Sequence, residues 1–314
     1  MGIVVVGSIA LDTVSTPRHK KQKVLGGSAV YSAIAASHFV NTRLLGIIGE
    51  DYPEEALSML ECRGIDLEGV ERSAGRTFAW EGEYGDDLRE PRTLSVELNA
   101  FAGYSPKIPA AYALEEILFL GNIDPDLQSS VFQKMRSPRI VAADTMGHWL
   151  DLKLESLKNL LPSLNVFFIN ESEAKKLAGE GKVVRAAFKI GRQGPHLVVI
   201  KCGEYGALAW DSRRERFFWE PAYPTFEVID PTGAGDSFAG GFLGSLSAES
   251  DPYCAEAIKR ALAVGNVLAS FAISSLGPDG VLGITREGLA GRLANLAAMS
   301  AGGACADEPA EVSF

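Results

Sequence analysis

Short apolar runs, each bounded by glycine, aspartate or asparagine, recur along the first two thirds of the chain. Runs of this kind without polar alternation are typical of strands buried on both faces of a parallel sheet. They occupy Ile3–Val6, Arg43–Ile48, Ile117–Leu120, Ile140–Ala143, Val166–Ile169 and Leu197–Ile200. The pattern therefore predicts a mostly parallel sheet.

Helix-length stretches separate several of these runs. In Ser28–Phe39, Pro53–Arg63 and Leu152–Leu160, apolar residues recur every three or four positions, the spacing of one face of a helix. Alternation of strands with such helices favours a doubly wound α/β fold with helices on both faces of the sheet.

Two segments, 13–24 and 76–102, break this alternation. Within the second, Thr77–Tyr84 and Arg92–Leu98 alternate polar and apolar residues on either side of Gly85-Asp86-Asp87, which is typical of a hairpin. We expect these two segments to form a small antiparallel β lid outside the main fold. The core domain then comprises residues 1–12, 25–75 and 103–298.

The last residues, 299–314, are rich in alanine, glycine and acidic side chains and have no periodicity. Such a segment cannot bury enough apolar surface to order itself. We expect it to be a disordered tail without a role in function.

Composition narrows the class of partner. The 30 Lys and Arg against 40 Asp and Glu give a net charge of -10, which repels phosphate backbones and argues against nucleic-acid binding. No apolar run reaches the length of a membrane span, and the N-terminus lacks the pattern of a signal peptide. We expect a cytoplasmic protein that acts on a small molecule.

Parallel sheets of this kind bind ligands beyond the carboxyl ends of their strands. Polar residues at the predicted strand ends are therefore the first candidates for a site. These residues are Asp12, Asn122, Asp144, Asn170 and Asp230.

The segment Asp230-Pro-Thr-Gly-Ala-Gly-Asp236 carries the strongest chemical signal. The sequence predicts a strand ending at Asp230 and an amphipathic helix beginning near Asp236, with Gly233–Gly235 between them. Small residues let backbone N–H groups approach a phosphate, and the helix start adds unpaired donors and a positive dipole end. The segment therefore predicts an anion hole.

Asp236 itself has two interpretations. An aspartate before a helix is most often an N-cap. Beside a phosphate-binding turn, however, a carboxylate would be repelled unless it accepts a proton from a hydroxyl that attacks the phosphate. The pairing of hole and carboxylate favours the second interpretation.

From Asp230 through Leu243 the segment resembles the second signature of the ribokinase, or PfkB, family of carbohydrate and nucleoside kinases. The resemblance implies a doubly wound sheet covered by a β lid, with Asp236 as catalytic base and Gly233, Ala234 and Gly235 as the hole. It also implies ATP and Mg²⁺ as cofactors, and Asp230 is compatible with the monovalent cation, K⁺, that stimulates some relatives.

The resemblance extends to nucleotide-side residues. Asn170-Glu-Ser-Glu173 is similar to a motif that organises magnesium and its waters, so Glu173 would hold Mg²⁺ through water; a helix capping box explains the same spacing. Lys201, Gly203 and Gly206 resemble a turn beside the nucleotide, for which an ordinary hairpin is the alternative. Further nucleotide-side candidates are Thr232 and Asn266, the latter in an apolar helix where its amide requires a partner.

On the acceptor side, Asp12 resembles the acidic residue with which relatives hold two sugar hydroxyls. The diglycine Gly26-Gly27 resembles the junction of lid and body, and it opens a helix at Ser28. In the first family signature, however, Tyr31 replaces an expected asparagine. The acceptor-side candidates are Asp12, Gly26, Gly27, Ser28 and Asn122.

The predicted lid carries Phe78, Trp80 and Tyr84 on one strand face, with Gly82 leaving a gap between the last two. These aromatic rings could cover a sugar or a nucleobase. They could equally form a lid-to-lid homodimer, because a small isolated sheet gains stability from a partner.

These features predict a kinase that transfers the γ-phosphate of ATP to a hydroxyl of a small sugar or sugar-like substrate. The alternatives are a nucleoside kinase and, from another class, a binding sensor that kept the fold without catalysis. A dinucleotide-binding Gly-x-Gly-x-x-Gly does not follow the first strand, and a P-loop is absent from the sequence, so neither a dehydrogenase nor a P-loop enzyme is favoured.

Overall fold

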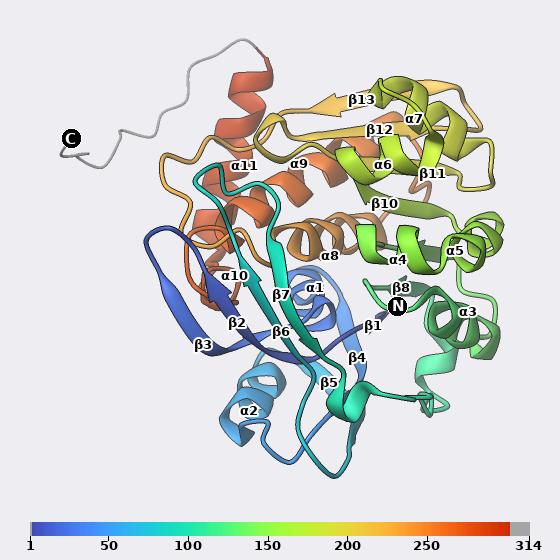
Figure 1. The fold of residues 1–314 in the computed structure, drawn as a ribbon. Coiled ribbons are helices and arrows are strands. Elements are labelled where there is room, and N and C mark those ends of the chain that lie inside the picture. Colours follow the sequence, from blue (N-terminus) through green and yellow to red (C-terminus); the bar gives the residue numbers. More distant parts are fainter. Residues whose placement is uncertain (1, 302–314) are drawn as a thin grey trace.

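The computed structural model describes residues 2–301, and Figure 1 shows how they are arranged. Within this range one sheet has the strand order β13-β12-β11-β10-β9-β8-β1-β4-β5. From β11 to β5 neighbouring strands are parallel, whereas β12 and β13 add an antiparallel meander at one edge. Its strands are β1 (Gly2–Val6), β4 (Asn41–Ile48), β5 (Ile65–Arg72), β8 (Ile117–Leu120), β9 (Ile140–Ala143), β10 (Val166–Asn170), β11 (Leu197–Lys201), β12 (Ala207–Asp211) and β13 (Arg216–Glu220).

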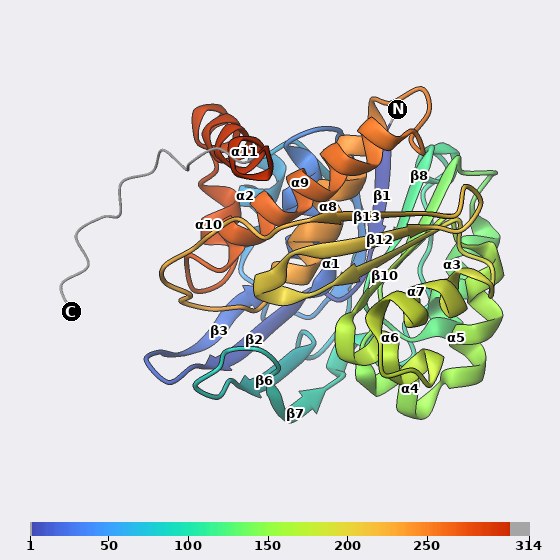
Figure 2. The ribbon, with the colours of Figure 1, turned by 90° about the horizontal axis from the view of Figure 1, so that it is seen from above.

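Helices cover both faces of this sheet, as Figure 2 shows. One layer consists of α1 (Ser28–Ser37), α2 (Glu54–Cys62), α8 (Ala234–Ser247), α9 (Ala255–Ala272), α10 (Asp279–Leu282) and α11 (Arg286–Ser300); the other consists of α3 (Pro125–Lys134), α4 (Gly147–Leu152), α5 (Leu154–Leu160), α6 (Glu171–Ala178) and α7 (Val183–Gly191). Single 3-10 turns lie at Asn99–Phe101, Tyr112–Leu114, Leu161–Ser163 and Gly203–Tyr205.

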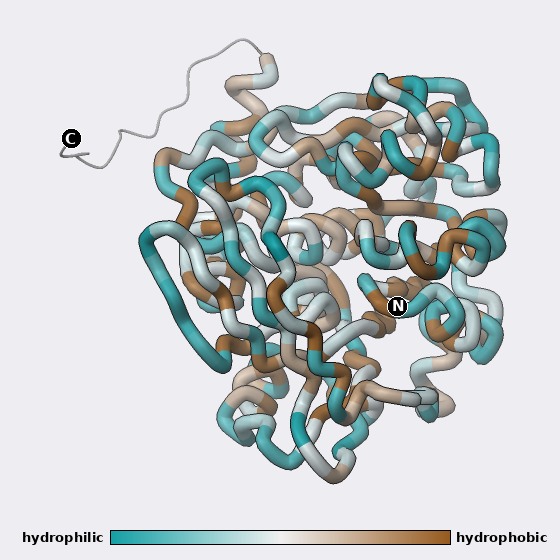
Figure 3. Tube along the Cα trace, in the orientation of Figure 1, coloured by the Kyte–Doolittle hydropathy of each residue, from teal (hydrophilic) through white to brown (hydrophobic). Residues whose placement is uncertain are grey.

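The central strands are apolar on both sides because each side packs against a helical layer. In β1, Ile3 and Val5 join the core under α1 and α8, whereas Val4 and Val6 join the core on the α3 side. The brown strands at the centre of Figure 3 show the same continuous apolar character. The predicted doubly wound fold is confirmed.

A four-stranded sheet covers one end of the main sheet, in the order β3-β2-β6-β7. We call it the lid; its strands are β2 (Ala10–Ser15), β3 (Lys20–Gly26), β6 (Ala79–Glu83) and β7 (Arg92–Glu97). It consists of two antiparallel hairpins, but β2 and β6 are parallel to one another. The expectation of a wholly antiparallel lid was therefore wrong at its centre, because β2 and β6 leave the body side by side, joined where Leu11 N donates to Phe78 O.

Two local predictions also differ from the structure. The predicted helix Leu152–Leu160 is divided between α4 and α5 at Lys153, whose φ of -136° leaves the helical region. The predicted strand before Asp230 is irregular, because Ile229 N donates to Ile273 O at the end of α9 instead of to a strand. Of the expected tail, residues 299 and 300 end α11, and residues 302–314 lie outside the described residues.

Candidate active site

The glycine at the start of α8 is fixed by two separate constraints. Gly233 is the N-cap, with φ 77°, a conformation that costs little only in glycine. A Cβ there would also lie 2.4 Å from ring atoms of Tyr31. Ala234 N donates back to Pro231 O at 3.2 Å, so an anion bound at this turn would meet the N–H groups that follow Ala234 at the start of α8.

Asp236 lies in the first turn of α8, and the helix has no side-chain cap. The N-cap interpretation of Asp236 was therefore wrong, since Gly233 occupies that position. Burial, followed by the neighbouring Asp144 carboxylate, raises the pKa of Asp236 to about 6, and Lys201 opposes this shift. Its carboxyl group is thus tuned toward the range in which a general base works best at neutral pH.

Lys201, the last residue of β11, forms a buried ion pair with Asp144, which follows β9. Lys201 Nζ lies 2.5 Å from Asp144 Oδ2, and a Cβ on Gly235 would lie 3.0 Å from the same Nζ. The pKa of Lys201 is raised by Asp144 and Asp236, although burial opposes this. A fixed ammonium therefore lies directly against the glycine turn, where negative charge would gather during phosphate transfer.

The predicted capping box at the start of α6 is present. Asn170 Oδ1 accepts from Glu173 N at 2.8 Å, and Glu173 Oε2 accepts from Asn170 N at 3.1 Å. Burial raises the pKa of Glu173 to about 7. The structural interpretation of this motif is confirmed.

The carboxylate of Glu173 is a suitable ligand for Mg²⁺, which keeps most of its water and binds one or two carboxylates together with phosphates. No group of three or more His, Cys, Asp or Glu side chains forms a metal cage within residues 2–301. A magnesium ion held through water on Glu173 needs no such cage. This role for Glu173 stays a prediction.

Asp230 is buried at the turn before the glycines. Its Oδ1 accepts from Thr232 N at 2.9 Å, its Oδ2 accepts from Gly277 N at 3.4 Å, and burial raises its pKa. Thr232 Oγ1 lies 3.1 Å from the hydroxyl of Tyr84, at the end of lid strand β6. The monovalent cation predicted at Asp230 stays a prediction, but its carboxylate clearly organises the turn.

The Lys201–Gly206 segment is the hairpin between β11 and β12, as the alternative interpretation expected. Gly203 and Gly206 both have positive φ, 57° and 93°. Asn266 in α9 has the partner that its burial requires, because its Nδ2 donates to Glu220 O and Pro221 O at 3.1 and 3.0 Å. A Cβ on Gly206 would meet Glu220 O at 2.1 Å, so Gly206 and Asn266 border the same chain segment.

Asp12 lies inside lid strand β2, not at the end of β1, so its predicted placement was wrong. Its Oδ1 accepts from Trp80 N at 3.1 Å, and burial raises its pKa to about 7. The carboxylates of Asp230 and Asp236 also raise this pKa. Short polar contacts of this kind suit a group that holds substrate hydroxyls.

The diglycine provides the space for this carboxylate. A Cβ on Gly26 would lie 2.2 Å from Asp12 Oδ2, and Gly27, with φ 95°, would place one 2.3 Å from Ser8 O. Ser28 begins α1, and its hydroxyl accepts from Ser8 N at 3.2 Å. Gly26 thus borders Asp12 directly, whereas the Ser28 side chain ties α1 to the segment after β1.

Asn122 lies at the end of β8, but its side chain is used within the body. Its Oδ1 accepts from Trp149 Nε1 at 2.9 Å, and its Nδ2 lies 3.1 Å from Met146 Sδ. These contacts hold the loop after Asp144. No described contact links Asn122 to Asp12 or Asp236, so its role toward the substrate stays a prediction.

Two residues of the site escaped the sequence interpretation. Tyr31 was noted only as a departure from the first signature, yet its ring packs on Gly233. Burial, followed by the carboxylates of Asp230, Asp12 and Asp236, raises its pKa. Ser32, its neighbour in α1, donates from Oγ to Asp236 O at 3.1 Å. The sequence reasoning placed both only within the predicted helix Ser28–Phe39.

The family model described as "pfkB family carbohydrate kinase" matches residues 2–282. The chain belongs to this family. It is 29% identical over 250 residues to a cytidine kinase from Thermococcus kodakarensis, covering 79% of this chain and 89% of that one. It is 28% identical over 237 residues to a fructoselysine 6-kinase from Shigella flexneri, covering 71% and 82%.

A solved structure supports the PfkB fold. A putative ribokinase II from E. coli, in complex with ATP and Mg²⁺, superimposes with a TM-score of 0.70 at 18% identity and covers 89% of this chain and 95% of that one. As a PfkB-family kinase, the chain is a phosphotransferase with a hydroxyl acceptor, and ATP with a divalent cation is its expected donor. No helix within residues 2–301 is long and apolar enough to cross a membrane.

Proposed function

We propose that this PfkB-family protein is an ATP-dependent nucleoside kinase. Asp236 takes the proton from an acceptor hydroxyl, the acceptor oxygen bonds to the γ-phosphorus, and the bond to the β-phosphate oxygen breaks to release ADP. Gly233, Ala234 and Gly235 with the Lys201 ammonium stabilise the charge on the transferred group. Glu173 would hold Mg²⁺ through water, and Mg²⁺ when bound neutralises phosphate charge.

The lid face opposite the glycine turn carries the argument for a nucleoside. In the parallel pair β2–β6, Thr13 is paired with Glu81. Asp12 and Trp80 each precede this pair by one residue, so their side chains lie on the same face of the lid. The half-buried Trp80 indole donates from Nε1 to Thr93 Oγ1 at 3.1 Å. It lies over Gly82, where a Cβ would come within 2.0 Å of the ring.

This geometry offers a carboxylate for the hydroxyls of a sugar beside a flat, fixed aromatic surface. Any nucleobase can stack on such a surface. The likeness to a cytidine kinase supports the same class of acceptor. A sugar kinase is the second candidate, which the likeness to a fructoselysine 6-kinase supports.

An acceptor panel tests the proposal directly. Nucleosides and free sugars, at equal concentration with ATP and Mg²⁺, are compared by acceptor-dependent ADP release. We expect the highest kcat/KM with a nucleoside. Turnover of sugars alone would establish the second candidate, and no acceptor-dependent turnover with any compound would favour the binding sensor.

Replacing Trp80 by alanine should raise KM for the nucleoside by about 10-fold or more, because stacking on an aromatic side chain contributes roughly 1–3 kcal/mol per base. The change in kcat should be smaller. Trp219→Ala, which removes a half-exposed indole from β13 at the edge of the main sheet, is the matched control. Equal effects of the two substitutions on KM would contradict a platform at Trp80.

The pH profile should report the carboxyl groups of the free enzyme. Both Asp236, with a pKa of about 6, and Asp12, with a pKa of about 7, act as carboxylates, so protonation of either lowers activity. We expect log kcat/KM to fall between pH 7 and 5 with a slope above one. Asp12→Asn should lower the plateau and reduce that slope, and an unchanged slope would exclude Asp12 from the profile.

A further inference from the structure

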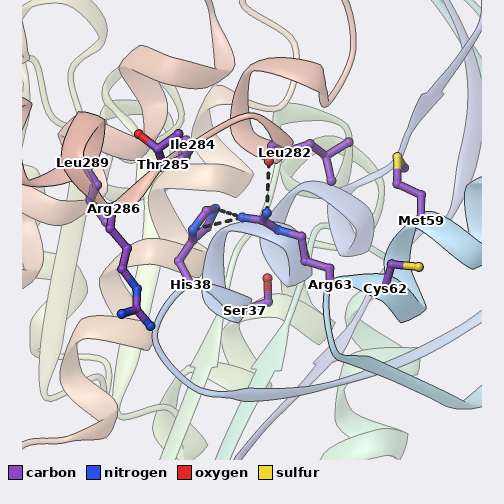
Figure 4. A pocket seen from close by; sticks show the side chains of 10 residues that line it. All are labelled: Ser37, His38, Met59, Cys62, Arg63, Leu282, Ile284, Thr285, Arg286 and Leu289. Atoms are coloured by element: carbon purple, nitrogen blue, oxygen red, sulfur yellow. Dashed lines mark hydrogen bonds between the residues drawn. The ribbon is translucent and has the colours of Figure 1, made fainter.

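A cavity of about 550 Å³ lies at the C-terminal end of α1, whereas Gly27 and the candidate active site lie at its N-terminal end. This open cavity is lined by residues of α1, α2, α10 and α11 and of the segments next to them. Its lining residues are Ser37, His38, Met59, Cys62, Arg63, Leu282, Ile284, Thr285, Arg286 and Leu289. Figure 4 shows them from close by.

The lining contains two arginines and no carboxylate, which is unusual in a chain with a net charge of -10. Arg63 follows the end of α2, and its guanidinium makes contacts with neutral groups. Nη1 donates to Leu282 O and Nη2 to His38 Nδ1, both at 3.0 Å. Burial lowers the pKa of Arg63.

His38 does not add to this charge. Burial, followed by the Arg63 guanidinium, lowers its pKa to about 4, so the imidazole is neutral near pH 7. Arg63 Nη2 lies 3.0 Å from His38 Nδ1 and 2.5 Å from Nε2, and Nε2 lies 3.1 Å from Val281 O. His38 thus holds the guanidinium in place without competing for an anion.

Arg63 still has unused donors. A guanidinium carries five N–H groups, two of which make the contacts described, and its buried Nε has no partner. Arg286 is exposed in the first turn of α11 and also lines the cavity; in Figure 4 its guanidinium lies on the other side of His38 from that of Arg63. Two guanidinium groups that line one cavity offer N–H donors suited to a dianion with several acceptor oxygens.

The remaining walls are apolar, formed by side chains such as Leu282, Ile284 and Leu289. A bare inorganic ion would leave this surface unused. We propose that the cavity binds a phosphomonoester, with its phosphate paired to Arg63 and Arg286 and its organic part against these three side chains. The site is separate from the kinase site and does not depend on the proposed acceptor.

Binding of phenyl phosphate to the full chain, measured by calorimetry, tests this site. A non-hydrolysable ATP analogue with Mg²⁺ is kept saturating so that the kinase site does not take up the probe. We expect phenyl phosphate to bind more tightly than inorganic phosphate because only the ester contacts the apolar walls. Tighter binding of inorganic phosphate, or no binding of either, would overturn the proposal.

Arg286→Gln is the decisive variant, because Arg286 is exposed and its loss leaves the core intact. We expect its affinity for phenyl phosphate to fall by at least about 10-fold, as charge-assisted hydrogen bonds would be lost. Arg185→Gln, which removes an exposed arginine from α7 in the opposite helical layer, should bind like the wild type. Equal affinities of all three proteins would reject the site.

Discussion

Replacing Asp236 by asparagine is expected to lower kcat by about 1000-fold or more, since general-base catalysis typically contributes 10²–10⁴-fold. Asparagine keeps the size of the side chain but cannot accept the proton of the attacking hydroxyl. The burial of Asp236 beside Asp144 means that removing its charge also relieves repulsion, so the protein should fold normally. Acceptor-dependent ADP release measures the loss in kcat. Equilibrium nucleotide binding checks that the variant still folds normally.

Asp126→Asn provides the matched control, because Asp126 is also an acidic residue in the first turn of a helix, here α3. Its carboxylate pairs with Lys153 at 2.6 Å on an exposed surface, so its loss should leave kcat unchanged. Full activity of Asp236→Asn would refute the assignment of the base. A loss of nucleotide binding equal to the loss in kcat would instead indicate a structural role.

Lys201→Met should reduce both stability and turnover. It leaves the Asp144 carboxylate buried without its partner, and breaking a buried ion pair typically costs about 3–5 kcal/mol. That is a large part of the total stability of an ordinary domain. Urea unfolding measures this change, while kcat should also fall because the anion hole loses its fixed positive charge.

The double substitution Lys201→Met with Asp144→Asn separates the two effects. Removing both charges relieves the unpaired carboxylate, so the free energy of unfolding should recover much of the loss. The kcat should stay low, because the ammonium beside Gly235 is still missing. Recovery of kcat together with stability would show that Lys201 acts only through folding.

The repeated apolar runs predicted the central strands well because both sides of each strand are buried, which excludes polar residues. The segment before Asp230 misled the same reasoning. Its apolar residues suggested a strand, but Phe226 is 79% exposed and the backbone bonds to the end of α9. Local sequence does not encode which backbone partner a short segment will find.

The candidate active site, too, could be predicted from the sequence only in part. The glycine turn could be predicted because only glycine fits both the φ of Gly233 and the ring beside it. The pair of Asp144 with Lys201, 2.5 Å apart, could not be predicted, since Asp144 follows β9 and Lys201 ends β11, with β10 between these strands. Similarly, nothing local in the sequence indicated that Tyr31 would lie under the anion hole.

The position of Asp12 in a lid strand has a consequence for wasteful hydrolysis. A substrate that offers its hydroxyls to Asp12 would at the same time draw the lid down over the glycine turn. A water molecule has no sugar ring to connect that carboxylate with Asp236, so it cannot close the site in the same way. Fidelity toward the acceptor and protection of ATP would then arise from one and the same carboxylate.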